Sequence, residues 1–251
     1  RTVFARRLII LSRVESRYYL LILAPPVSDM VLVIVPAYNE EEKIGRVIRG
    51  LFEQGLKNVV VVDDGSTDGT VAEAEKLGVK ILRHEINRGQ GAALETGNAY
   101  ARLVNADQVV HFDADDQFNP ADVLDGVSLM GQKNLDVVFG SRFIDERSKI
   151  PWLKRVIILP LSRWVNFVFT GCLLSDAHNG FRILSKNALG MLHITHDRMA
   201  HNTEIVRQVK KFHLRYAEFP VEVKYHTYGQ GVGGGFMILR DLIVGLFTRL
   251  I

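Results

Sequence analysis

The chain has 251 residues, of which 47% are hydrophobic, so it can bury one sizeable core as an α/β domain with additions. Its single cysteine, Cys172, excludes an internal disulfide framework and a cysteine-rich zinc site. The net charge of +3 is only mildly basic, and no run of Lys and Arg with interleaved aromatic residues indicates nucleic-acid binding.

Residues 1–29 differ in pattern from the rest of the chain. Arginines alternate there with apolar clusters, and the regular pattern starts only at Met30. A basic amphipathic anchor on a membrane surface is one interpretation. A leader or upstream translated sequence outside the main fold is the interpretation that we favour. We expect an N-terminal extension over 1–29, a main domain over 30–229 and an amphipathic segment over 230–251.

From Met30 onward, apolar strands alternate with amphipathic helices. Residues 31–35 are an all-apolar run typical of a strand that is buried on both faces, and residues 41–54 carry apolar side chains at helical spacing. The pattern predicts further strands over 59–62, 79–82, 109–112 and 136–139, and further helices over about 70–77 and over 92–104. Short loops between alternating strands and helices predict a mostly parallel, doubly wound sheet flanked by helices.

Acidic and polar residues follow three of these strands. They are Glu40, the pair Asp63-Asp64, and the run 113–117, which reads Asp-Ala-Asp-Asp-Gln. Because parallel strands end at the same edge of a sheet, where ligands bind in such folds, we expect one site there. Crowded carboxylates repel each other unless a cation neutralises them, and oxygen ligands suit Mg or Mn. A solvated acidic turn is the alternative for any one loop, but three loops at one edge favour a site.

The sequence lacks the signatures of two common nucleotide-binding classes. The first strand is followed by Pro-Ala-Tyr-Asn-Glu (36–40) and not by G-x-G-x-x-G, and no Walker A lysine motif is present. After the acidic run, Asn119 as a cap and Pro120 at the first helical position predict a helix start.

Five ordered motifs resemble those of glycosyltransferase family 2. They are Val-Pro-Ala-Tyr-Asn-Glu-Glu (35–41), Val-Asp-Asp-Gly-Ser-Thr-Asp-Gly-Thr (62–70), Asn-Arg-Gly (87–89), Asp-Ala-Asp-Asp-Gln (113–117) and Gly-Ser-Arg-Phe (140–143). The resemblance runs from about Val31 to Gly229 and, within the family, is greatest to the dolichyl- or polyprenyl-phosphate sugar synthases. It implies a GT-A, Rossmann-like fold over 30–229 and an inverting, metal-dependent transfer from a UDP- or GDP-linked sugar.

The resemblance also implies residues for the donor side of the site. Those matched to nucleotide-sugar contacts are Pro36, Tyr38, Glu40, Asp63, Asp64, Arg88, Asp113, Ala114, Glu204, Lys224 and His226. Asp113, Asp115 and Gln117 match the residues that hold Mg or Mn and the diphosphate, whose developing charge the ion would stabilise. For Arg88, a plain surface arginine is an equal alternative. These three residues and Asp176 are the expected catalytic residues.

On the acceptor side, the expected residues depend on the acceptor. A phosphate monoester is already nucleophilic at neutral pH and needs cations to hold it, whereas a sugar hydroxyl needs a general base. Arg142 matches a family position that meets the acceptor phosphate. Arg155, Ser162 and Arg163 lie where further contacts occur, with solvated helix charges as the alternative. Asp176 is expected to contact the donor sugar, or to act as a base toward a hydroxyl acceptor.

Two further motifs bear on the site. Gly180-Phe181-Arg182 is expected to be a structural turn and packing element. An arginine that precedes the last Tyr-Gly of the mannose synthases by two positions is replaced here by His226, with Lys224 nearby. Histidine is a weaker, pH-dependent substitute, which argues against mannose and a guanine nucleotide.

Two apolar segments indicate contact with a membrane. The apolar spacing predicts amphipathic helices in a membrane interface over residues 156–174 and 236–251. Trp152 and Trp164 flank or lie in the first segment as interfacial aromatics do. Neither is a charge-free run of about 18 residues, so neither predicts a membrane span. Core or oligomer-contact helices are the alternative.

The expected function is therefore sugar transfer to a polyprenyl phosphate by a peripheral protein on the cytoplasmic face of a membrane, with a membrane subunit as a further expected partner. The alternatives are transfer to a saccharide hydroxyl and a non-catalytic subunit that binds a nucleotide sugar.

Overall fold

The computed structural model describes residues 30–144, 171–176 and 179–224, the strands Leu11–Val14 and Arg17–Leu20, and the single positions 164 and 167. The predictions for Arg155, Ser162, Arg163, His226 and the segment 230–251 lie outside the described residues. The strands β1 (Leu11–Val14) and β2 (Arg17–Leu20) pair with each other in an antiparallel sheet of their own.

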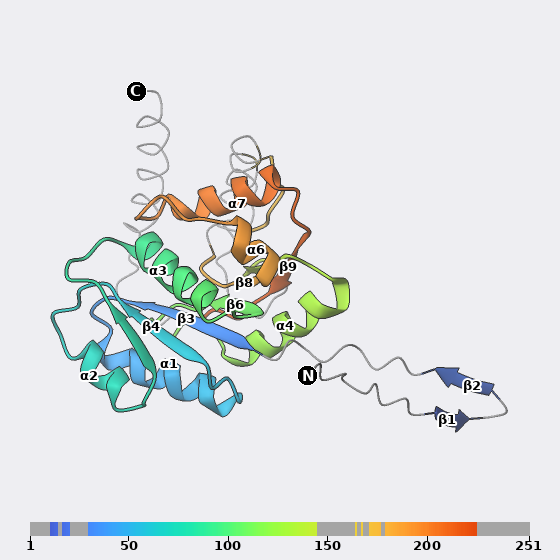
Figure 1. Ribbon diagram of the computed structural model, residues 1–251, viewed down its shortest axis with the longest axis horizontal. Coiled ribbons are helices and arrows are strands. Elements are labelled where there is room, and N and C mark those ends of the chain that lie inside the picture. The colour runs from blue at the N-terminus through green and yellow to red at the C-terminus, as the bar shows by residue number, and fades with distance from the viewer. Residues whose placement is uncertain are drawn as a thin grey trace, which may run out of the picture.

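A seven-stranded sheet forms the centre of the fold (Figure 1). In spatial order its strands are β5 (Lys80–Arg83), β4 (Val59–Asp63), β3 (Val31–Ala37), β6 (Gln108–His111), β8 (Arg182–Ser185), β7 (Val137–Ser141) and β9 (Tyr216–Pro220). The first four run parallel to one another, β8 is antiparallel to both of its neighbours, and β9 is parallel to β7. The prediction of a mostly parallel, doubly wound sheet is confirmed. The antiparallel β8 and the edge strand β9 were not predicted.

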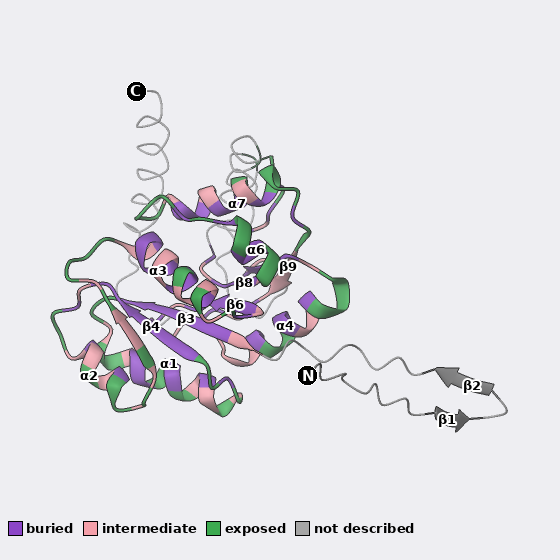
Figure 2. Ribbon diagram, viewed as in Figure 1, coloured by how far each residue is buried: buried purple, intermediate pink, exposed green. Residues whose placement is uncertain are grey.

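Helices cover both faces of the sheet. One face packs against α1 (Glu41–Glu53), α2 (Thr70–Glu75) and α4 (Ala121–Lys133), and the other against α3 (Gln90–Leu103), α6 (Lys186–Met191) and α7 (His201–Lys211). Successive strand residues point to opposite faces, so Val33 joins the first core while Leu32 joins the second. The central strands are buried on both sides, which explains their unbroken apolar sequence (Figure 2).

The predicted helices occur at nearly the expected bounds. In α1, Ile44, Val47, Ile48 and Leu51 are buried on one face as the spacing predicted. The Oδ1 atom of Asn119 accepts a hydrogen bond from the backbone N–H of Ala121 at 3.1 Å, and Pro120 has helical dihedral angles before α4. These caps fix where the chain leaves the acidic loop after β6.

Candidate active site

Three acidic loops lie at one edge of the sheet, because β4, β3 and β6 are parallel neighbours (Figure 1). The register pairs Ala37 with Asp63 across β3 and β4, and Ile34 with His111 across β3 and β6. The loops after β3 and β4 therefore start level with each other, and the loop after β6 starts three residues earlier in the register. Ligands of open α/β sheets bind at this edge, outside the carboxyl ends of the parallel strands.

The acidic loop after β6 is held by aromatic packing. The rings of Phe112, Phe118 and Phe181 contact one another edge to face, with centroids 5.7 to 6.4 Å apart. Asp116 adopts a left-handed conformation with φ of 62° and accepts a hydrogen bond from Arg46 Nε at 2.9 Å. The aromatic packing holds the loop at both ends, and the hydrogen bond from Arg46 holds Asp116 between them. These contacts orient Asp113 and Asp115.

Asp113 lies in a tight and electrostatically unfavourable place. Gln90 Nε2 donates a hydrogen bond to its Oδ1 atom at 2.7 Å. Burial and the neighbouring charge of Asp115 raise the pKa of Asp113 to about 7, with a smaller contribution from Glu40. Burial and Glu40 also raise the pKa of Asp115. A cation bound between these carboxylates would relieve their mutual repulsion.

The donor set fits a divalent ion that is shared with a ligand. Mg or Mn commonly uses one or two protein carboxylates and takes its other ligands from phosphates and water. Asp113 and Asp115 supply two such carboxylates. Within the described ranges, no group of three or more His, Cys, Asp or Glu side chains could hold a metal by itself. Gln117 donates its backbone N–H to Asp115 Oδ1 at 3.1 Å and accepts from the backbone N–H of Lys224 at 2.9 Å.

Asp64 organises the loop that contains Arg88. Its carboxylate accepts hydrogen bonds from the backbone N–H groups of Arg88 at 3.0 Å and Gly89 at 2.6 Å, and it lies 2.7 Å from His84 Nδ1. His84 Nε2 lies 2.9 Å from Thr96 Oγ1 on α3. These contacts connect the end of β4 with the start of α3, so Asp64 determines how the glycine-flanked loop lies.

The other predicted donor residues on β3 and β4 differ in exposure. Pro36 is buried within β3, whereas Tyr38, one residue beyond the strand, is 46% exposed and offers an aromatic face. Asp63 is fully buried and accepts from the backbone N–H of Ser66 at 3.3 Å. Ala114 is also buried, between the two carboxylates of the acidic loop. Pro36 and Asp63 are therefore buried in the sheet, and they influence the site through the loops that follow them.

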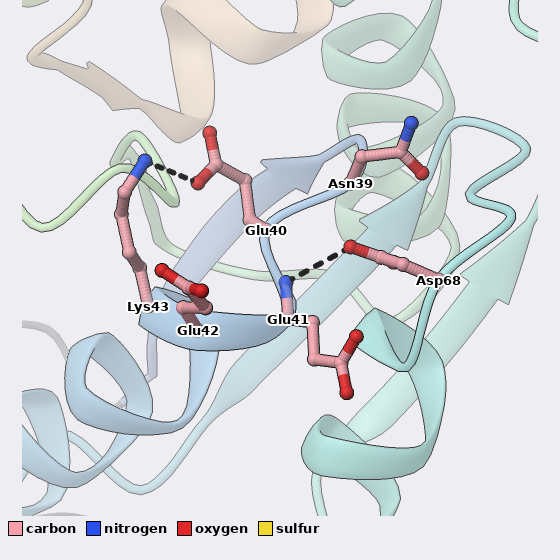
Figure 3. A pocket seen from close by; sticks show the side chains of 6 residues that line it. All are labelled: Asn39, Glu40, Glu41, Glu42, Lys43 and Asp68. Atoms are coloured by element: carbon pink, nitrogen blue, oxygen red, sulfur yellow. Dashed lines mark hydrogen bonds and ion pairs between the residues drawn. The ribbon is translucent and has the colours of Figure 1, made fainter.

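Glu40 lies at the rim of a hollow of about 240 Å³ (Figure 3). The hollow is lined by Asn39, Glu40, Glu41, Glu42, Lys43 and Asp68. Lys43 Nζ lies 2.7 Å from Glu40 Oε2, which partly neutralises one of four carboxylates. Such an acidic surface repels phosphate groups, so a diphosphate is not expected to bind in this hollow.

Arg142 and Asp176 form a bidentate ion pair at the end of β7. The Nε and Nη2 atoms of Arg142 donate to the two carboxylate oxygens of Asp176 at 2.6 and 2.8 Å. The structure therefore brings together Arg142, predicted to meet the acceptor phosphate, and Asp176, predicted to contact the donor sugar or to act as a base. Arg182, on β8, is fully buried nearby. Burial lowers its pKa to about 10, against the attraction of Asp113 and Asp176, so it stays a cation at neutral pH.

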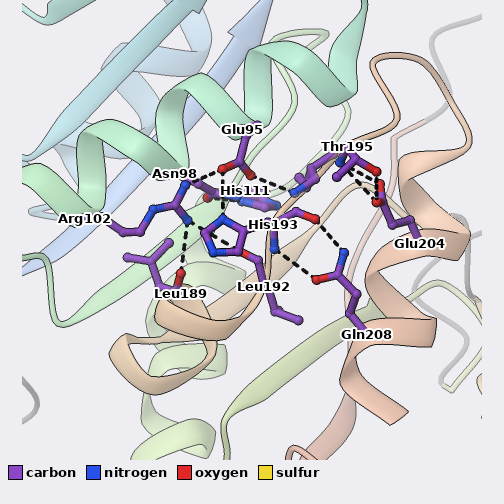
Figure 4. A network of polar contacts seen from close by, with 11 residues as sticks. Glu95, Asn98, Arg102, His111, Leu189, Leu192, His193, Thr195, Glu204 and Gln208 are labelled. Carbon is purple, nitrogen blue, oxygen red and sulfur yellow. Dashed lines mark hydrogen bonds and ion pairs between the residues drawn. The ribbon is translucent and has the colours of Figure 1, made fainter. Parts of the chain in front are cut away.

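Glu204 occupies a different position from the acidic loops. It accepts a hydrogen bond from the backbone N–H of Thr195 at 3.0 Å (Figure 4). The backbone N–H of His196 donates to the same carboxylate, also at 3.0 Å. Burial favours a higher pKa for the Glu204 carboxyl. These hydrogen bonds, together with one from the Thr195 hydroxyl, have the larger effect, so the pKa of Glu204 lies below its ordinary value. The backbone carbonyl of Asp197 accepts from Ala92 N at 3.1 Å. Glu204 therefore helps to hold this segment against the start of α3.

Sequence reasoning missed several residues that shape the site. Gln90 and His84 contact Asp113 and Asp64, respectively, and Glu218 contacts the segment that carries Asp176. Gln90 follows the predicted Asn-Arg-Gly motif directly, which was the only local signal. Arg88 was predicted to contact the nucleotide sugar. Its Nη2 atom lies 3.5 Å from Asp197 Oδ1, and about half of its side chain is exposed.

The mixed, mostly parallel sheet and its acidic edge define a GT-A-like fold. The fold is shared with a crystal structure of glucosyl-3-phosphoglycerate synthase from Mycobacterium tuberculosis in complex with UDP, at a TM-score of 0.65 and 21% identity. That match covers 88% of this chain and 79% of the other.

Sequence comparisons give the family. Residues 32–192 match the model of glycosyl transferase family 2. An uncharacterized protein of Methanocaldococcus jannaschii is 37% identical over 225 residues, which are 86% of this chain and 92% of that protein. A UDP-N-acetylglucosamine–dolichyl-phosphate N-acetylglucosaminyltransferase of Methanococcus voltae is 31% identical over 84% of this chain and 92% of that protein. The chain belongs to glycosyltransferase family 2, and it is an enzyme that transfers a sugar from a nucleotide sugar.

Proposed function

We propose that the chain transfers a sugar from a UDP- or GDP-linked donor to a membrane polyprenyl phosphate, with inversion at the sugar carbon and with Mg or Mn bound. The observation that carries this proposal is the pairing of Arg142 with Asp176. Asp176 is the predicted candidate base, and both of its oxygens are engaged by the Arg142 guanidinium. A site that offers a cation in place of a free base suits a phosphate acceptor, which needs no deprotonation.

On the donor side, Asp113 and Asp115 would hold the divalent ion together with the donor diphosphate. The ion would stabilise the charge that develops on the leaving diphosphate. Tyr38 would pack against the nucleoside, and Asp64 would contact it while holding the Arg88 loop in place. Gln117 would keep Asp115 oriented through its backbone N–H.

On the acceptor side, Arg142 would bind the phosphate monoester and hold one of its oxygens in line with the departing diphosphate. The buried cation Arg182 attracts both Asp113 and Asp176 and would help to hold the two carboxylates in place. The family relative from Methanococcus voltae is named as a transferase to dolichyl phosphate, which supports the same acceptor class here.

With a polyprenyl phosphate as acceptor, the protein would act as a peripheral enzyme on the cytoplasmic face of a membrane, and a membrane subunit is a further proposed partner. In the part of the chain that the structure describes, no helix has both the length and the apolar character needed for crossing a bilayer. The segments 156–174 and 230–251 are proposed to lie in the interface.

A transfer assay tests this proposal. The full chain would be incubated with Mn or Mg, radiolabelled UDP- and GDP-sugars, and polyprenyl phosphate in detergent. We expect label in the lipid phase, lost on chelation and reduced at least about 100-fold by Asp115→Asn. Asp125→Asn, an exposed position on α4, is the matched control and should keep full activity.

The outcomes separate the alternatives. Turnover only on saccharide acceptors would overturn the proposal of a phosphate acceptor, and it would favour Asp176 as the general base. Nucleotide and metal binding without turnover on any acceptor would indicate a non-catalytic subunit.

A further inference from the structure

Glu218, on the edge strand β9, anchors the segment that carries Asp176. Its Oε1 atom accepts three hydrogen bonds: from the backbone N–H of Ser175 at 2.6 Å, from the Ser175 hydroxyl at 2.6 Å and from the backbone N–H of Asp176 at 3.3 Å. Hydrogen bonds to a charged acceptor are stronger than neutral ones. One carboxylate oxygen therefore fixes the backbone on which the Asp176 side chain is mounted.

Asp176 transmits this anchoring to Arg142. In addition to the bidentate pair, Asp176 Oδ2 accepts from the backbone N–H of Arg142 at 3.2 Å and from Asn179 Nδ2 at 3.2 Å. A bidentate carboxylate sets the plane of a guanidinium as well as its position. The orientation of Arg142 therefore depends on where Asp176 lies.

A chain of hydroxyl groups connects Glu218 with the backbone beyond Arg142. An ionised carboxylate can only accept, so the Ser175 hydroxyl donates to Glu218 and accepts from the Ser141 hydroxyl at 2.5 Å. Ser141 Oγ in turn accepts from the backbone N–H of Phe143 at 3.2 Å. The residues on both sides of Arg142 are thus tied to Glu218, independently of the ion pair.

The charges in this region also depend on one another. Glu218 binds the backbone N–H groups of Ser175 and Asp176, so one carboxylate holds the residue that carries the other. Two cations attract the Asp176 carboxylate: Arg142, by direct hydrogen bonds, and the buried Arg182. Moving any one member would therefore be expected to displace the Arg142 guanidinium.

We propose that Glu218 is a positioning residue for Arg142, holding its guanidinium in the orientation that receives the phosphate of the acceptor. The inference rests on the proposed function, because it takes Arg142 as the acceptor-phosphate residue. A role confined to tying β9 to the neighbouring segment would stabilise the fold without affecting the acceptor selectively. The experiment must separate these two roles.

Steady-state kinetics of Glu218→Ala and Glu218→Gln would make this separation. We expect Glu218→Ala to raise the KM for polyprenyl phosphate on the order of 10- to 100-fold while the donor KM stays unchanged. Glu218→Gln keeps an acceptor oxygen of the same shape, so it should restore part of the acceptor affinity. If both variants melt like the unmodified protein and keep its acceptor KM, the proposal is overturned.

The matched control lies at the other end of the same two strands. Asp136, just before β7, accepts from Arg215 N at 2.9 Å and lies 3.0 Å from Arg215 Nε, just before β9. Asp136→Asn removes a comparable carboxylate tie between the strands and should leave the acceptor KM unchanged. An equal rise in acceptor KM in this control would assign the Glu218 effect to general loosening and overturn the proposal.

A second measurement keeps the inference separate from the proposed function. Hydrogen exchange of the Ser175, Asp176 and Phe143 amides should be faster in Glu218→Ala than in Asp136→Asn. If the unmodified protein transfers sugar to no polyprenyl phosphate, the proposed function fails, yet faster exchange would still support Glu218 as the anchor of this loop. Unchanged exchange would overturn the anchoring, whatever the acceptor.

Discussion

A Cβ atom on Gly180 would lie 2.2 Å from the Oδ2 atom of Asp113. The backbone before β8 therefore forms one wall of the acidic site, and a side chain at position 180 would require the Asp113 carboxylate or this backbone to move. The next two residues contribute from the same strand start: Phe181 packs on the rings of the acidic loop, and Arg182 is the buried cation that attracts Asp113. Gly180-Phe181-Arg182 thus packs against the acidic loop after β6, in agreement with the predicted packing role, and also places a buried cation beside it.

Gly180→Ala is expected to displace the Asp113 carboxylate or the backbone opposite it. Because a shift of about 1 Å in a catalytic group can cost two orders of magnitude, we expect Mn affinity and transfer rate to fall by up to about 100-fold. Isothermal titration with Mn in the presence of UDP would measure the affinity. Gly190→Ala in α6, whose Cβ would meet no atom within 4 Å, is the control. Unchanged Mn affinity in a folded Gly180→Ala protein would contradict this account of the wall.

Asp113 should make the stability of the metal-free protein depend on pH. Burial and Asp115 raise its pKa from the ordinary 3.8 to about 7, so the folded state binds a proton more tightly than the unfolded state. The free energy of unfolding should therefore fall as pH rises from about 4 to 7. Asp113→Asn removes this penalty, so its stability gain should be small near pH 4 and reach a plateau, at most about 4 kcal/mol, above pH 7.

Urea unfolding of both proteins across this pH range, with chelator present, would measure the difference. Asp125→Asn should show a constant difference from the unmodified protein. Adding Mn should reverse the order above pH 7, because the ion stabilises only the protein with the carboxylate. If Asp113→Asn raised the free energy of unfolding equally at every pH, the pKa of the Asp113 carboxyl group would not be raised in the folded protein.

Asp64→Asn should weaken donor binding through the Arg88 loop. An amide has one acceptor oxygen, so one of the two backbone donors, Arg88 N–H or Gly89 N–H, would face the amide nitrogen and lose its partner. An unsatisfied donor costs about 1–3 kcal/mol, which predicts a loss of UDP affinity of about fivefold or more. Titration calorimetry with UDP measures it, and Asp107→Asn, at the opposite end of β6, is the control. Should the acceptor KM rise instead of the donor KM, Asp64 would not belong to the donor side.

The sequence predicted those parts of the fold that are encoded locally. The strands β3, β4 and β6 are short apolar runs between helices with one apolar face, so their positions followed from periodicity. Their parallel arrangement followed from the alternation of strands and helices, and so did the shared edge on which Glu40, Asp64 and Asp113 lie.

The remaining features depend on contacts between distant parts of the chain. The strand β8 has four residues and begins with a buried arginine, so no hydrophobic pattern marks it. Its place between β6 and β7 is set by pairing with residues more than 40 positions away. Glu218 contacts Ser175 across 43 positions and His84 contacts Asp64 across 20, and neither relationship leaves a local pattern.

Gly97→Ala should destabilise the protein although alanine is the better helix former. Gly97 lies on the buried face of α3, and a Cβ atom there would be 2.4 Å from Ile34 Cγ2 and 3.0 Å from its Cδ1 on β3. The α3 helix or the strand must shift to admit the methyl group, and overpacking of this kind costs about 1–3 kcal/mol. Gly131→Ala in α4 meets no atom within 4 Å and should be stabilising by up to about 1 kcal/mol. Urea denaturation of both variants would compare the two effects directly. A Gly97→Ala protein as stable as Gly131→Ala would mean that α3 does not pack as closely on β3 as the contact requires.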